Sequence, residues 1–109
     1  MEKELVWTAE AKEMLMQIFD GLVSKDSTMA ASVIREVYAR AQVLLKTPEI
    51  GWPIEAAPTN RIAPKRDVRY IRYGHYRIAY EVLVPDCIVI LTVFTAPDRS
   101  EPAAFGTVT

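Results

Sequence analysis

Apolar residues recur at helical spacing in two consecutive segments of the first half of the chain. After Thr8, a typical helix N-cap residue, one apolar stripe is formed by Ala11, Leu15, Ile18, Phe19 and Leu22. The polar stretch 24–27 ends this helix and offers Asp26 or Ser27 as the next cap. A second stripe predicts a helix over about residues 28–46, which Thr47-Pro48 terminates. Two amphipathic helices with so short a connection predict an antiparallel hairpin.

The rest of the chain has the pattern of strands. Residues 4–7 predict a short first strand, and residues 66–73, 75–84 and 87–95 predict three more, separated by turns at Gly74 and Pro85-Asp86. Residues 48–64 hold four of the seven prolines and no periodic pattern, which predicts a long surface loop.

These elements predict an α+β domain with the order β-α-α-β-β-β. We expect the helix hairpin to pack on one face of an antiparallel sheet, and the other face to carry polar residues. With 109 residues, 50% apolar and 25% charged, the chain suits one soluble domain over residues 1–95, followed by a loosely ordered tail over 96–109.

Composition excludes several classes of protein. No apolar run is long enough for a membrane span, and the acidic start (Glu2, Glu4) is unlike a secretory signal. One cysteine and one histidine can form neither an internal disulfide nor a four-ligand zinc site. We therefore expect a cytoplasmic protein with no metal and no cofactor.

The net charge of −1 conceals a basic segment. Residues 61–77 hold six basic side chains against Asp67 alone, which gives +5: Arg61, Lys65, Arg66, Arg69, Arg72 and Arg77. Such a segment indicates a specific acidic partner, and the interleaved tyrosines would also suit stacked bases. The plainer interpretation is a solvated strand face whose arginines pair with Glu81, Asp67 or Asp98.

No standard catalytic motif is present. His75 is either a general acid or base or simply the residue beside the Gly74 turn, and Cys87 suits a small core position. Trp7 suits a packing role, whereas Trp52 either folds back on the helices or is exposed.

The order and spacing of several short motifs resemble the RelE/ParE superfamily of bacterial type II toxins. These motifs are Ala11-x-x-x-Leu15, the pair Ala30-Ala31, Leu44-x-x-x-Pro48-x-x-Gly51, and Arg72-Tyr-Gly-x-Tyr-Arg-Ile-x-Tyr80, followed by an apolar strand that ends in Val93-Phe94. The resemblance covers residues 5–95 and implies a toxin, of the kind also called plasmid stabilisation protein, with an antitoxin encoded beside it.

Two mechanisms occur in this superfamily. RelE-like members cut messenger RNA on the ribosome, whereas ParE-like members poison DNA gyrase without nuclease chemistry. Here no tyrosine follows Tyr80, and Thr95 stands where the family often has histidine. The residues left for a nuclease are Arg61, Lys65, Arg66, His75 and Arg77. We therefore favour a growth-arresting gyrase inhibitor over an enzyme, with an inactive toxin homologue as a third alternative.

The resemblance also implies partners and surfaces. We expect gyrase to contact Arg61, Arg66, Arg69, Arg72 and Arg77. We expect the antitoxin to contact Trp7, Leu15, Phe19, Tyr38 and Trp52. The ribosome with messenger RNA is the alternative target, no membrane partner is expected, and a dimer and a heterotetramer with the antitoxin both remain open.

Overall fold

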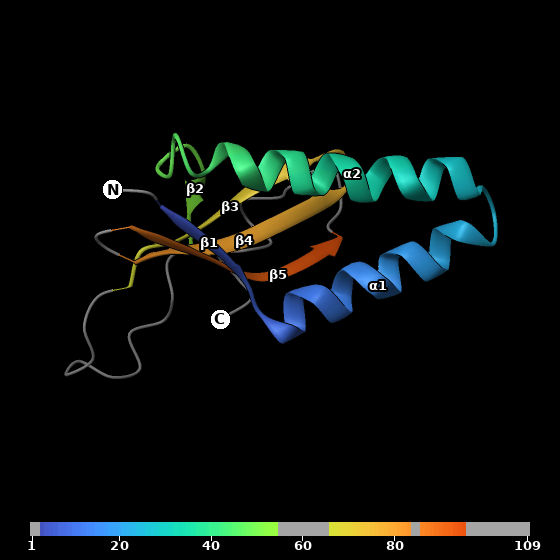
Figure 1. The fold of residues 1–109 in the computed structure, drawn as a ribbon, viewed down its shortest axis with the longest axis horizontal. Helices are drawn as coiled ribbons and strands as arrows, with labels where there is room; N and C mark the ends of the chain where they lie inside the picture. Colours follow the sequence, from blue (N-terminus) through green and yellow to red (C-terminus); the bar gives the residue numbers. More distant parts are fainter. Residues whose placement is uncertain (1–2, 55–65, 84–85, 96–109) are drawn as a thin grey trace.

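A helix hairpin packs on a five-stranded sheet in the computed structural model, which describes residues 3–54, 66–83 and 86–95 (Figure 1). The elements are β1 (Glu4–Trp7), α1 (Ala9–Val23), α2 (Ser27–Val43), β2 (Trp52–Pro53), β3 (Val68–Tyr73), β4 (Tyr76–Leu83) and β5 (Cys87–Thr95). The α+β class and the helix hairpin are confirmed. The predicted tail, 96–109, lies outside the described residues.

Both helices begin at the predicted capping residues. The Thr8 side chain accepts a hydrogen bond from the Ala11 amide, and the Asp26 carboxylate accepts one from the Met29 amide. Each bond satisfies one of the amides that have no partner inside the helix. The Thr8 hydroxyl also lies 3.0 Å from the carbonyl oxygens of Ile90 and Leu91, so the cap fixes the start of α1 to β5.

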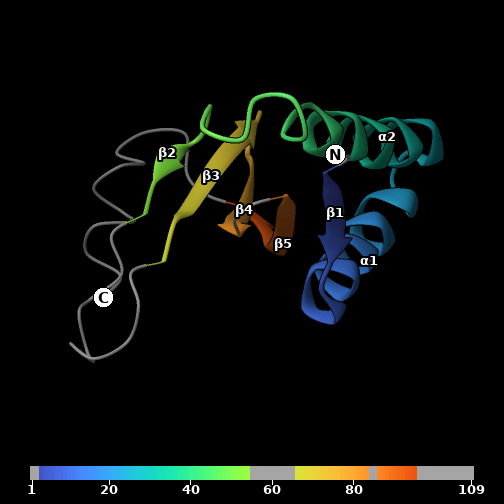
Figure 2. The same cartoon turned by 60° about the vertical axis from the view of Figure 1, so that its left-hand side comes forward.

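The sheet is mixed, which corrects the expectation of a purely antiparallel sheet. Its strand order is β1-β5-β4-β3-β2, and Figure 2 shows β1 beside α1 at one edge and β2 at the other. β1 runs parallel to β5, with Glu4 opposite Cys87 and Trp7 opposite Ile90. The tight turns at residues 74–75 and 86 make the other long strands antiparallel. The sequence holds no such local signal for the direction of β1, because its partner β5 lies some 80 residues further along the chain.

The short strand β2 is a second difference, because it lies inside the segment predicted as a loop. Trp52 pairs with Tyr70 and Pro53 with Arg69, and the Ile54 amide donates to the Val68 carbonyl. Two residues with a proline are too few to produce a strand pattern in the sequence.

The core lies between the helix hairpin and one face of the sheet. Its buried residues come from the helix hairpin, the C-cap of α2, and strands β4 and β5: Ala11, Leu15, Val33, Val37, Ala41, Leu44, Ile78, Tyr80, Ile88, Ile90 and Val93. α1 lies over β5, and the C-terminal end of α2 reaches β3. The connection between the helices projects beyond the sheet (Figure 1). The chain that leaves α2 is therefore brought directly to the β2–β3 edge.

Candidate functional site

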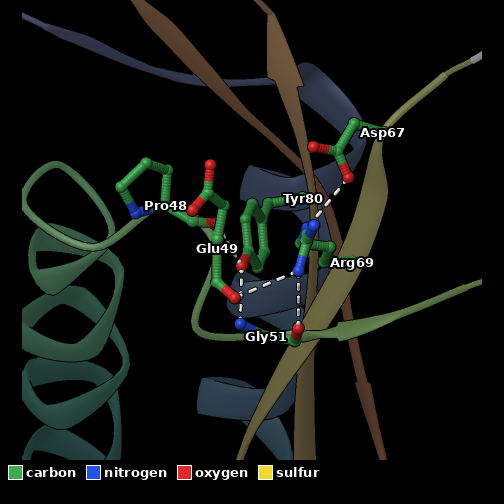
Figure 3. Close-up of polar contacts among 6 residues, drawn as sticks. All are labelled: Pro48, Glu49, Gly51, Asp67, Arg69 and Tyr80. Carbon is green, nitrogen blue, oxygen red and sulfur yellow. Dashed lines mark hydrogen bonds and ion pairs between the residues drawn. The ribbon is translucent and has the colours of Figure 1, made fainter.

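The segment that follows α2 is fixed to the sheet by one buried tyrosine. The Tyr80 hydroxyl donates to the Pro48 carbonyl at 2.8 Å and accepts from the Gly51 amide at 3.0 Å (Figure 3). Tyr80 is 0% exposed and lies on β4, in the centre of the sheet. Its hydroxyl therefore satisfies two backbone groups of a segment that is neither helix nor strand.

Arg69 on β3 holds the same segment from the other side. Its Nη1 donates to the carbonyls of Glu49 and Gly51, at 3.0 and 3.1 Å, and its Nε donates to Asp67 at 2.8 Å (Figure 3). The ion pair with Asp67 orients the guanidinium toward the two carbonyls. We call Tyr80, Arg69 and Gly51 the loop anchor.

Gly51 is required by how closely the chain approaches the sheet. A Cβ atom at this position would lie 2.6 Å from the Tyr80 hydroxyl oxygen and 2.7 Å from the Tyr70 carbonyl oxygen. The spacing Pro48-x-x-Gly51 and the final tyrosine of the Arg72–Tyr80 motif therefore meet in space. These residues have a structural role, because their hydrogen bonds join the segment after α2 to the sheet.

Replacing Tyr80 with phenylalanine tests this role. The change leaves the Pro48 carbonyl and the Gly51 amide without their partner, so we expect a loss of about 2 kcal/mol of unfolding free energy at neutral pH. Urea denaturation of Tyr80→Phe measures it. Tyr38→Phe is the matched control, because Tyr38 is 43% exposed, and it should change stability by less than about 0.5 kcal/mol.

The pH dependence of the same pair adds a second readout. Burial raises the pKa of the Tyr80 hydroxyl above its usual 10.0, and the Gly51 hydrogen bond lowers it only in part. The native state thus favours the protonated phenol, so this stability is complete below pH 10 and is lost as the pH rises through the native pKa. We expect the stability difference between wild type and Tyr80→Phe to shrink above about pH 10. If the stability difference between wild type and Tyr80→Phe stayed constant at all pH values, the conclusion that burial raises the pKa of the Tyr80 hydroxyl would be wrong.

A groove of about 500 Å³ runs between the C-terminal half of α2 and the β2–β3 edge. One wall belongs to α2, and the other belongs to the segment that the loop anchor holds. The residues that line it are Glu36, Ala39, Arg40, Val43, Leu44, Ile50, Trp52, Ile71 and Arg72. We call it the α2 groove.

Two arginines of the α2 groove lie over aromatic rings. The Arg72 Cζ lies 5.5 Å from the centroid of the Trp52 ring, and Trp52 in turn stacks on Tyr70 at 5.4 Å. The Arg40 Cζ lies 4.9 Å from the centroid of the Tyr73 ring. Contact with a ring restrains a long side chain, and the Arg40 Nε also donates to the Glu36 carboxylate at 3.3 Å.

The basic segment does not form one exposed surface. Arg66 is exposed and pairs with Glu81 at 2.8 Å, which raises the pKa of its guanidinium, first through the hydrogen bonds and then through charge. Arg69 is held in the loop anchor, and Arg72 is exposed at the α2 groove. Arg61 lies outside the described residues.

Arg77 corrects the expectation of an exposed arginine face. It is 1% exposed, and its Nη1 donates to the carbonyls of Gly74 and Tyr76, at 2.9 and 3.0 Å. Gly74 has a φ of 59°, so Arg77 stabilises the turn that this left-handed residue makes. In this structure, Arg77 cannot contact a target at the surface.

The residues expected to bind an antitoxin fall in different places. Leu15 is 5% exposed and lies in the core, so its contact with a partner stays a prediction. Phe19 is half-buried on α1. Trp7 packs on Tyr38 with ring centroids 4.7 Å apart, and Trp52 is 50% exposed at the α2 groove. Tyr38 therefore faces β1, away from the groove.

The residues of the alternative nuclease do not converge where they are described. Arg66 reaches Glu81 at one end of the β3–β4 hairpin, whereas His75 lies exposed in the turn at the other end. The six residues of β3 separate these ends by roughly 20 Å. Arg77 is buried, and Lys65 lies outside the described residues. A proton carrier and a phosphate-binding arginine must lie within a few ångströms of one scissile bond.

Of the residues that line the groove, sequence reasoning had singled out only Trp52 and Arg72 as site residues, and it missed, among others, Arg40, Val43 and Ile50. Glu36, Arg40 and Val43 are spaced i, i+4 and i+7 on α2, which is the signal of a second, partly apolar stripe beside the core stripe. The isolated Ile50 gives no such signal, because its neighbours in space come from other elements.

Within residues 3–54, 66–83 and 86–95, no group of three or more histidine, cysteine, aspartate or glutamate side chains could hold a metal ion. Over the same residues, no helix is both long and apolar enough to cross a membrane.

The fold and the site define a small α+β domain with a helix hairpin on a mixed sheet and a groove at one edge. A family model for the "ParE toxin of type II toxin-antitoxin system, parDE" matches residues 5–97. The chain therefore belongs to the ParE toxin family, which confirms the resemblance noted in the sequence.

A solved structure agrees with this fold. A chain of the "Chromosomal ParDE TA system from P. aeruginosa" is 18% identical to this chain, with a TM-score of 0.65 over 88% of this chain and 98% of that chain. At this identity the likeness shows the fold alone. No curated protein matches.

Proposed function

We propose that this ParE-family toxin inhibits DNA gyrase in the cytoplasm and is neutralised by a cognate antitoxin. The family match over residues 5–97 carries the proposal. The separation of Arg66 from His75 by the length of β3 supports protein binding over RNA cleavage.

A supercoiling assay with purified gyrase tests the target. We expect relaxed plasmid to remain relaxed when the toxin is added in molar excess, and we expect supercoiling to return when the toxin is first mixed with its antitoxin. Arg66→Ala should weaken inhibition, because Arg66 is exposed in the basic segment. Lys12→Ala is the matched control, because Lys12 is an exposed cation on α1 outside that segment, and it should inhibit like wild type.

The alternatives predict different results in the same experiments. Supercoiling that is unaffected at high toxin excess would exclude a gyrase inhibitor. Message cleavage mapped in arrested cells would then identify a RelE-like nuclease, and intact messages with normal growth would identify an inactive homologue.

A further inference from the structure

The sheet has a second face, which is turned away from the helix hairpin and is partly buried. Tyr70 is 3% exposed and Ala79 is 5% exposed, yet neither belongs to the core cluster between the hairpin and the sheet. The two residues lie opposite each other on β3 and β4, whereas their chain neighbours Ile71 and Ile78 face the hairpin. We call this side of the sheet the far face. The sequence predicted polar residues here, but the face also carries apolar ones: Val68, Tyr70, Ala79, Val89 and Phe94.

Burial at the centre of this face requires a cover. In the part of the chain that the structure describes, α1 and α2 are the only elements outside the sheet, and they pack on the opposite face (Figure 2). Trp52 stacks on Tyr70 from the edge strand β2, whereas Ala79 lies one strand further in. We propose that the segment after β5, residues 96–109, folds back across the far face and covers it. This contact replaces the loosely ordered tail expected from the sequence.

The segment begins at a suitable place and is long enough for this path. β5 ends at Thr95, which pairs with Tyr76 at the first residue of β4. The 14 residues from 96 to 109 span about 46 Å when extended, whereas the nine residues of β5 span about 30 Å. A segment that reverses its direction after Thr95 can therefore recross the whole far face.

The charges of the far face favour a carboxylate in the first part of the segment. Arg72 and Arg77 lie directly opposite each other, so two positive charges are neighbours on this face. Phe94 lies on the other side of Arg77, and Asp98 follows Phe94 by four residues. A carboxylate so close along the chain reaches the two guanidinium groups once the segment turns back, and it offsets their repulsion. Glu101 follows one extended turn later.

The composition of the segment also suits the face. Residues 96–109 hold two carboxylates and one arginine, a net charge of −1, whereas residues 55–65 hold one carboxylate and two basic side chains, a net charge of +1. The acidic segment is the better match for the arginine pair. Phe105 and Val108 supply apolar side chains for the row of Tyr70 and Ala79. An intramolecular cover of this kind keeps an apolar surface away from other proteins.

Alkylation of a thiol placed on the far face tests the proposal. In the full-length toxin with Cys87→Ser, Ala79→Cys places the only thiol of the chain at the centre of this face. We expect iodoacetamide to react slowly with this thiol, as measured by intact mass. Phe105→Ser should raise the rate about 10-fold, because loss of one buried aromatic contact releases the segment more often. Thermal unfolding should show that each variant is folded.

Two controls separate release of the segment from general loosening of the fold. Val33→Cys places the thiol in the core beneath the hairpin, at a position that is 6% exposed, and Phe105→Ser should leave its rate unchanged. Met16→Ser removes an exposed apolar side chain of α1, and it should not alter the rate at Ala79→Cys. If Ala79→Cys does not fold, Thr92→Cys serves instead, because Thr92 lies opposite Ala79 on β5.

The charge contact is tested in the same assay. Asp98→Asn should raise the alkylation rate at Ala79→Cys about 3-fold, as expected for the loss of a partly exposed ion pair. Added salt should raise the rate of the protein with Asp98 and have less effect on Asp98→Asn. Glu13→Gln is the matched control, because Glu13 is an exposed carboxylate of α1, and it should leave the rate unchanged.

The outcomes are decisive and do not depend on the target of the toxin. If Ala79→Cys reacts equally fast with Phe105 and with Phe105→Ser, the segment does not cover the far face and the proposal is overturned. If the rate falls as the protein concentration rises, a second copy of the chain covers the face and the proposal is likewise overturned. Slow alkylation that only the changes in segment 96–109 accelerate is the supporting result, whether or not the toxin inhibits gyrase.

Discussion

Gly51→Ala should lower the unfolding free energy by about 3 kcal/mol, because the added methyl group meets a backbone carbonyl and a fixed ring. The Cβ would lie 2.7 Å from the Tyr70 carbonyl oxygen and 2.9 Å from Tyr80 Cε1. Neither atom is the free end of a flexible chain. The loop must move away from the sheet, which breaks the hydrogen bond from the Gly51 amide to Tyr80. Thermal denaturation should show a midpoint about 15 °C lower.

Gly21→Ala is the matched control for this substitution. Gly21 lies in α1, and a Cβ there would meet nothing within 4 Å. Alanine in a helix is more favourable than glycine by roughly 0.5–1 kcal/mol, so Gly21→Ala should stabilise the protein. A Gly51→Ala variant as stable as wild type would show that the loop does not lie on the sheet.

Arg77→Ala should cost about 3 kcal/mol, which is the second large effect. The change leaves a cavity in place of a side chain that is 1% exposed, and it removes the donor to the carbonyls of Gly74 and Tyr76. Urea denaturation measures the loss. Arg77→Lys should lose less, because an ammonium group retains one donor while its shape fits the site poorly.

Arg72→Ala is the control for Arg77, because the two residues face one another across β3 and β4. Arg72 is exposed, so its removal should change stability by less than about 1 kcal/mol. Equal losses for the two variants would contradict the assignment of Arg77 as a structural residue. Both residues are arginines on the same pair of strands, so a difference in stability between the two variants reports the effect of burial.

Local patterns predicted the helices and strands because their signals are local. The stripe from Ala11 to Leu22 and the caps at Thr8 and Asp26 depend on residues within one helix. The parallel pairing of β1 with β5 depends on residues some 80 positions apart, and the sequence carries no pattern for it.

Alternation along a strand misled the assignment of Arg77. Arg77 alternates with apolar residues and shares a face with His75 and Glu81, which is the pattern of a solvated face. In the structure it is buried. Periodicity states which residues share a face, but it does not state what covers that face.

The α2 groove could not be predicted for a related reason. Its lining comes from a helix, a loop and a strand edge, so residues such as Val43 and Ile71 become neighbours only after folding. The sequence singled out Trp52, which is large and lies among prolines, but left open whether it is packed or exposed. It is both, because one side stacks on Tyr70 and half of it remains accessible.

The position of β5 between β1 and β4 has a consequence for synthesis on the ribosome. β5 contributes Ile88, Ile90 and Val93 to the core, and β1 has no neighbouring strand until β5 pairs with it. A nascent chain that ends before Cys87 therefore lacks both an inner strand of its sheet and the partner of its first strand. Contacts between such distant segments also form slowly. The domain thus acquires its folded form only late in translation.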